Sequence, residues 1–123
     1  MDINASPDPS HRAPFGCSVE ATLSVIGGRW KPVILFKLME NGVLRFGELR
    51  RLVPGVTQKM LTNQLRELEA DGVVHREVFA EVPPRVEYQL TPYGRTLENI
   101  LLAMRTWGAT HTQRVSESEE APK

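Results

Sequence analysis

Cysteine is almost absent from this chain, since Cys17 is the only one among 123 residues. An internal disulfide cannot form, which excludes the small secreted folds that depend on several disulfides. The first residues, MDINASPDPSHRAP, are polar and include no apolar stretch of the kind that a secretory signal peptide needs. Together these features predict a cytoplasmic location.

Long apolar runs are also missing. No run approaches the roughly 20 apolar residues that a membrane-spanning helix requires, so we expect no membrane partner. A chain of 123 residues can nevertheless bury a core without a metal or a disulfide. We predict one domain at residues 15–112, a disordered tail at 1–14 and an acidic disordered tail at 113–123.

Motifs for catalysis and for metal binding are absent as well. His11, His75 and His111 lie far apart in the sequence, and no pair has the spacing of metal ligands. The sequence contains no glycine-rich phosphate loop and no recognisable pairing of a nucleophile with a base. We therefore expect neither an enzyme nor a bound cofactor.

Acidic residues are scarce in one segment of this chain, although its formal net charge is zero. Between Arg45 and Arg66, Glu48 is the only acid. The same segment contains five basic residues, namely Arg45, Arg50, Arg51, Lys59 and Arg66. Because local charge rather than net charge steers a polyanion toward a surface, this segregation is compatible with a nucleic-acid partner.

The spacing of apolar, capping and turn-forming residues predicts a mainly α-helical domain with a β-hairpin. The hairpin is expected because residues after Gly72 are rich in β-branched side chains, with one interruption at Pro83-Pro84. We expect a helix at Cys17–Ile26, a central helix after Trp30 that ends before Gly42, a short extended VLRF segment, helices at Phe46–Val53 and Thr57–Asp71, strands at Val73–Ala80 and Val86–Leu90, and a long last helix from Thr91-Pro92.

The helix predicted at Thr57–Asp71 has two different faces. Its apolar face comprises Leu61, Leu65 and Leu68, with Met60 expected to widen it. The opposite face contains Gln58, Lys59, Thr62, Asn63 and Arg66. Ordinary solvated helices tend to carry an acid in the first turn, whereas this one has none before Glu67. A face made of long hydrogen-bonding side chains without acids is typical of a helix that lies against DNA.

The order of these elements predicts a winged helix-turn-helix, an α+β fold in which the β-hairpin is the wing. The helix at Thr57–Asp71 would enter the major groove, where Gln and Asn can pair bidentately with adenine and Lys can reach guanine or phosphate. Arg85 is expected at the hairpin tip, in reach of a minor groove or a phosphate. The predicted DNA-binding residues are Arg50, Arg51, Thr57, Gln58, Lys59, Thr62, Asn63, Arg66 and Arg85.

The last helix carries apolar residues on more than one face, although a domain of this size has only one core to cover it. We therefore predict a homodimer that recognises a palindromic operator in double-stranded DNA. The residues expected at the interface between the first and last helices are Val19, Leu23, Leu97, Ile100, Leu101, Met104 and Trp107.

Several motifs between Cys17 and Trp107 resemble the HxlR-type transcriptional regulators, which are relatives of the MarR group. They read GGRWK, RFGELRR, KMLTNQLRELEADGVV, VPPRVEYQLT and YGRTL. The resemblance implies a homodimeric DNA-binding winged helix that dimerises through its first and last helices. Ser18 departs from the family pattern, because many members have proline after the cysteine, but serine can cap the helix in its place.

Cys17 has two possible roles. The N-terminus of a helix stabilises the thiolate form of a cysteine, which is the reactive form. The resemblance implies that a cysteine at this position senses oxidants, quinones or aldehydes. In that case the protein is a repressor that releases its operator when Cys17 is modified. In the alternative, Cys17 is structural and a small molecule is the signal. A third hypothesis keeps the fold but makes it a protein-interaction module without DNA binding.

Overall fold

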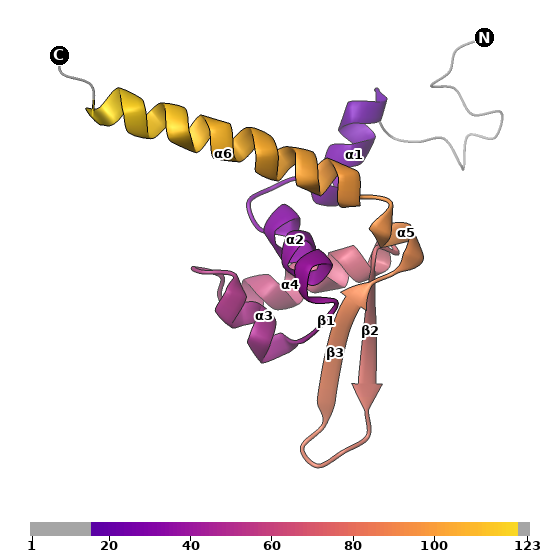
Figure 1. Ribbon diagram of the computed structural model, residues 1–123. Helices are drawn as coiled ribbons and strands as arrows, with labels where there is room; N and C mark the ends of the chain where they lie inside the picture. Colours follow the sequence, from indigo (N-terminus) through magenta and orange to yellow (C-terminus); the bar gives the residue numbers. More distant parts are fainter. Residues whose placement is uncertain (1–15, 121–123) are drawn as a thin grey trace, which may run out of the picture.

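The computed structural model describes residues 16–120, so the predicted tail at 1–14 lies outside the described residues. Its elements, labelled in Figure 1, are α1 (Ser18–Ile26), α2 (Lys31–Asn41), β1 (Val43–Arg45), α3 (Phe46–Leu52), α4 (Gln58–Ala70), β2 (Val74–Phe79), β3 (Arg85–Leu90), α5 (Pro92–Arg95) and α6 (Glu98–Glu120). Helices dominate and a small antiparallel sheet forms the rest, which confirms the predicted winged helix-turn-helix fold class.

The sheet has three strands in the order β1-β3-β2. The hairpin register pairs Val78 with Val86 and Arg76 with Tyr88. The extended segment predicted from VLRF is a true strand, because Leu44 pairs with Tyr88 on the other side of β3. This third strand ties the base of the hairpin to the start of α3, whereas the hairpin tip projects away from the helices (Figure 1).

The core is centred on α2, as its nearly continuous apolar sequence predicts. Ile34, Leu35 and Leu38 are buried, and so are the apolar residues of α4 that face them. Those α4 residues are Leu61, Leu65 and Leu68, the predicted inner stripe. Met60 is an exception to the prediction, since it is 42% exposed and does not widen the buried stripe.

The last helix differs from the prediction in its start. The single helix expected from Thr91-Pro92 is broken after α5, which ends at Arg95, and α6 begins at Glu98. Gly94 in α5 is packed directly on Val73, the residue before β2, where a Cβ would overlap the Val73 carbonyl oxygen. Because α5 packs on this backbone, the chain changes direction before α6, which packs against α2.

The end of the last helix differs as well. Residues 113–120, predicted as a disordered acidic tail, continue α6 to Glu120. Gln113 donates a 2.9 Å hydrogen bond to Glu117 one turn later, a spacing that supports an exposed helix. None of the helices in the described part of the chain is long and apolar enough to cross a membrane.

Candidate nucleic-acid interface

The turn between α3 and α4 fixes the direction of α4. Gly55 has a φ of +87°, a conformation that L side chains rarely adopt. A Cβ at this glycine would also lie 3.4 Å from the ring of Trp30, so the turn is packed closely on the corner before α2. Thr57 then starts α4 as predicted, because its hydroxyl oxygen accepts a 3.1 Å hydrogen bond from the Met60 N–H.

The outer face of α4 presents its polar residues to solvent. Gln58, Lys59, Asn63 and Arg66 are exposed, in agreement with the face expected to meet DNA. Thr62 is half-buried, and its hydroxyl donates a 2.8 Å hydrogen bond to the Gln58 carbonyl oxygen. Its one hydroxyl proton is therefore already in a hydrogen bond. Thr62 can contact a ligand only as a hydrogen-bond acceptor or through its methyl group.

The first acid of α4, Glu67, is exposed but forms an ion pair with the central helix. Glu67 accepts a 2.7 Å hydrogen bond from the ammonium group of Lys31, which is only 8% exposed at the start of α2. This ion pair joins α4 to the central helix. Glu48 is occupied in a similar way, since its carboxylate accepts a 2.7 Å hydrogen bond from the Arg45 N–H. Sequence reasoning did not foresee the role of Lys31, because a buried lysine leaves no periodic signal.

Two basic residues lie in the last turn of α3, the helix before the turn that leads to α4. Arg50 and Arg51 are both exposed, and neither forms an ion pair within the part of the chain that the structure describes. With the two acids of the region turned to Arg45 and Lys31, the combined face of α3 and α4 is positive. A positive face of this kind attracts a polyanion such as DNA.

Arg85 is placed differently from the expectation that it lies free at the hairpin tip. It is the first residue of β3, and its side chain is 27% exposed. Its guanidinium is 3.1 Å from the Glu81 carboxylate, 3.2 Å from the Glu87 carboxylate and 3.9 Å from the centre of the Phe79 ring. A DNA phosphate would have to compete with two carboxylates for this cation.

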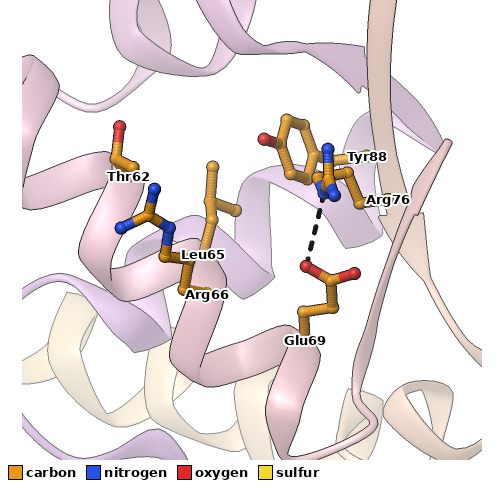
Figure 2. A pocket seen from close by; sticks show the side chains of 6 residues that line it. All are labelled: Thr62, Leu65, Arg66, Glu69, Arg76 and Tyr88. Atoms are coloured by element: carbon orange, nitrogen blue, oxygen red, sulfur yellow. Dashed lines mark ion pairs between the residues drawn. The ribbon is translucent and has the colours of Figure 1, made fainter. Parts of the chain in front are cut away.

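A polar pocket of about 230 Å³ lies between α4 and the hairpin (Figure 2). It is lined by Thr62, Leu65, Arg66, Glu69, Arg76 and Tyr88. An ion pair of 3.4 Å between Arg76 and Glu69 links the hairpin to the helix. Sequence reasoning missed Arg76 and Tyr88, although their direct pairing across β2 and β3 places both on one face of the sheet.

Helix α1 lies at the end of the fold away from the hairpin tip (Figure 1), and Cys17 is at its N-cap position. Its side chain is exposed and makes no capping hydrogen bond. The neighbouring Glu20 accepts a 2.7 Å hydrogen bond from the Gly16 N–H, so the capping interaction of this helix bypasses Cys17. The thiol is open to a reagent in solution.

Exposed apolar residues gather on α1 and α6, which lie next to each other at the end of the molecule away from the hairpin tip (Figure 1). Val19, Leu23, Ile100 and Met104 are exposed, and Trp107 is 69% exposed. Leu97 is half-buried and lines a groove of about 190 Å³ between α1 and the α5–α6 segment. The prediction for Leu101 was wrong, because Leu101 is 2% exposed and belongs to the core of its own chain.

Comparison with known proteins matches residues 25–116 to the HxlR-like helix-turn-helix family. Among curated relatives, the uncharacterized HTH-type transcriptional regulator YdeP of Bacillus subtilis is 55% identical over 108 residues. That match covers 88% of this chain and 84% of the relative. The family and the curated relative agree with the arrangement of α3, α4 and the hairpin.

Solved structures give the same result. The redox regulator HypR in its oxidized form is 58% identical with a TM-score of 0.73, and the match covers 76% of this chain and 96% of that one. The same regulator in its reduced form is 55% identical with a TM-score of 0.75, and the match covers 80% of this chain and 97% of that one.

Proposed function

The chain belongs to the HxlR-like helix-turn-helix family. We propose that it is a homodimeric, sequence-specific repressor and that modification of Cys17 releases it from DNA. Its relatives are transcriptional regulators rather than enzymes, and membership of the family implies DNA binding. The homodimer, the palindromic operator, the repression and the control by Cys17 are parts of this proposal. A DNA partner also agrees with the predicted cytoplasmic location.

The observation that carries the proposal is the outer face of α4. Its exposed polar side chains before Glu67 carry amide and cationic groups, and Glu67, the first acid, is paired with Lys31. Gln58 and Asn63 have the donor and acceptor pair that matches the major-groove edge of adenine. A protein-interaction module has no physical need to keep carboxylates off this face.

The homodimer is supported by the apolar surface on α1 and α6. An apolar patch of this kind on an isolated chain marks a contact with another molecule. A two-fold axis through such a patch would make two copies of α4 face the same side of a DNA duplex, and the operator would then be a palindrome.

Control by Cys17 is supported by its exposure beside that surface and by the redox regulator among the similar solved structures. The thiolate would attack one oxygen of a peroxide and break the O–O bond, which leaves a sulfenate and releases water, or the thiolate would add to a quinone or an aldehyde and form an S–C bond. With one cysteine per chain, the only disulfide between subunits joins the two copies of Cys17. Each of these modifications changes the charge or the bulk of the side chain next to the proposed interface.

DNA recovered with the purified protein should be sequenced, and the enriched duplex titrated by fluorescence anisotropy. We expect Gln58→Ala and Asn63→Ala to lose preference for the enriched sequence, at about 1–3 kcal/mol for each bidentate base contact. Asn99→Ala, an exposed amide on α6, is the matched control and should bind like the wild type. A wild-type protein that binds no duplex in low salt would refute the proposal and favour a protein-interaction module.

A further inference from the structure

The pocket between α4 and the hairpin carries more positive than negative charge (Figure 2). Arg66 forms no ion pair with any other residue that the structure describes. Arg76 faces Glu69, with 3.4 Å between its Nε atom and a carboxylate oxygen. Two cations and one carboxylate give the pocket a net charge of about +1.

Tyr88 adds a neutral donor to the same pocket. Its ring is buried, and Figure 2 shows the hydroxyl directed toward the α4 side. Burial raises the pKa of Tyr88 above its ordinary value of 10.0, against the opposing effect of Arg76. The hydroxyl is therefore protonated at neutral pH and able to donate a hydrogen bond. Thr62 supplies no proton to the pocket, because its hydroxyl donates to the Gln58 carbonyl oxygen.

Two guanidinium groups and a phenolic hydroxyl suit an oxyanion with several acceptor oxygens. Arginine binds phosphate through parallel N–H donors, and such charge-assisted bonds are stronger than neutral ones. We propose that this pocket binds one phosphate group of the DNA backbone, held by Arg66 and Arg76 as cations and by Tyr88 as a neutral hydrogen-bond donor.

The position of the pocket indicates DNA as the source of that phosphate, a step that rests on the proposed function. One sugar–phosphate strand separates a major groove from the next minor groove. If α4 lies in the major groove and the hairpin lies over the adjoining minor groove, this strand must cross the space between them. The pocket occupies that space, and the Glu69–Arg76 pair holds its two walls together.

The test uses the full chain and a 30-base-pair duplex of random sequence, because a phosphate contact is independent of sequence. The measurement is anisotropy as a function of salt concentration. Removal of one phosphate contact lowers the slope of log K against log salt by about 0.9. We expect Arg66→Gln and Arg76→Gln to flatten the slope, and the double variant to flatten it by about 0.9 in total, because both cations serve one phosphate. Arg114→Gln, an exposed arginine near the end of α6, is the charge-matched control.

Two further variants separate phosphate binding from a structural effect on the hairpin. Tyr88→Phe keeps the buried ring and should weaken binding about tenfold without a change in slope, since a neutral donor displaces no counterions. Glu69→Gln breaks the same ion pair as Arg76→Gln but removes a negative charge from the pocket, so it should bind the duplex more tightly. Circular dichroism checks that each variant is folded.

The outcomes that overturn this inference differ from those that overturn the proposed function. If Arg76→Gln kept the wild-type affinity and slope while Gln58→Ala lost its base preference, only the phosphate pocket would be refuted. If Glu69→Gln weakened binding as much as Arg76→Gln, the pair would be a structural link and not part of a phosphate site. A third outcome concerns free phosphate. If inorganic phosphate stabilised the wild type but not Arg76→Gln, and both proteins bound the duplex equally well, the pocket would be a site for free phosphate and the DNA contact would be refuted.

Discussion

At the scale of single residues, the position of Cys17 determines what its thiol can do. It lies at the start of α1 on the surface, within two residues of the exposed Val19. A sulfenate or an adduct at this position would place new charge or bulk beside the proposed subunit contact. A signal acts on a two-state protein only if it interacts differently with the two states, and a repacked dimer supplies that difference.

We predict that Cys17→Ser binds operator DNA like the wild type but does not respond to oxidant. Hydrogen peroxide or benzoquinone should release the wild type, because modification shifts the relative positions of the two α4 helices. Anisotropy measures the release, and intact-mass spectrometry identifies the modification on Cys17. Dithiothreitol should restore binding after peroxide but not after a stable quinone adduct. An equal response from both proteins would make Cys17 structural and favour a small-molecule signal.

Residues with a periodic role could be predicted from the sequence, and residues with an individual role could not. Leu61, Leu65 and Leu68 are buried as their helical spacing requires. Lys31 breaks the rule that charged residues stay outside, and only the proximity of Glu67, 36 positions later, explains it. Leu101 was assigned to the interface because it belongs to an apolar run, and no local pattern distinguishes a core residue from an interface residue within such a run.

At the scale of elements, the hairpin is stiffened by the residue that sequence reasoning had assigned to DNA. The guanidinium of Arg85 connects Glu81 in the loop to Glu87 on β3 and stacks on Phe79 of β2. These contacts join both strands and the loop between them. Because each contact depends on the planar, forked shape of arginine, lysine is not an equivalent replacement.

We predict that Arg85→Ala and Arg85→Lys both lower the free energy of unfolding, by about 1–2 kcal/mol, and leave the salt dependence of DNA binding unchanged. Urea unfolding at a fixed protein concentration measures the first effect, and anisotropy against salt measures the second. A phosphate contact would give a different pattern. Arg85→Lys would keep the wild-type slope of log K against log salt, whereas Arg85→Ala would flatten it. That pattern would return Arg85 to the set of DNA contacts.

Element boundaries could be predicted where local chemistry sets them. Thr57 begins α4 and Gly42 follows α2 as expected, because capping depends on neighbouring residues. The break before α6 was missed because the apolar pattern runs through it, and its cause is the distant contact of Gly94 with Val73. The pairing of β1 with β3 was missed for the same reason, since strand pairing is decided between segments far apart in the sequence.

At the scale of the whole molecule, the fold separates two surfaces. The polar pocket lies between α4 and the hairpin, whereas α1 and α6, which carry the exposed apolar residues of the proposed interface, lie at the end away from the hairpin tip (Figure 1). Between them, α2 packs on both α3 and α6. A change in how two copies of the α1–α6 surface meet would therefore move the two copies of α4 as rigid bodies and alter the distance between them.

This arrangement predicts that the α1–α6 surface, rather than the DNA-facing one, controls assembly. Leu23→Glu and Met104→Glu each place a charge on an exposed apolar residue of that surface, so each variant should fold normally but dissociate. Sedimentation equilibrium at micromolar concentration should give a mass near the 13.8 kDa of one chain for both variants and twice that mass for the wild type. Val43→Glu, an equally exposed apolar position on β1, is the control and should stay dimeric.

The same variants connect assembly to recognition. A dimer reads two half-sites whose centres lie about one helical turn, 10–10.5 base pairs, or a multiple of it apart. The wild type should therefore lose affinity when five base pairs are inserted between the half-sites, because half a turn rotates one site to the far side of the duplex. The monomeric variants should bind both spacings weakly and equally. A wild type that is monomeric at micromolar concentration, or one that binds a single half-site with full affinity, would contradict this account of how the two surfaces cooperate.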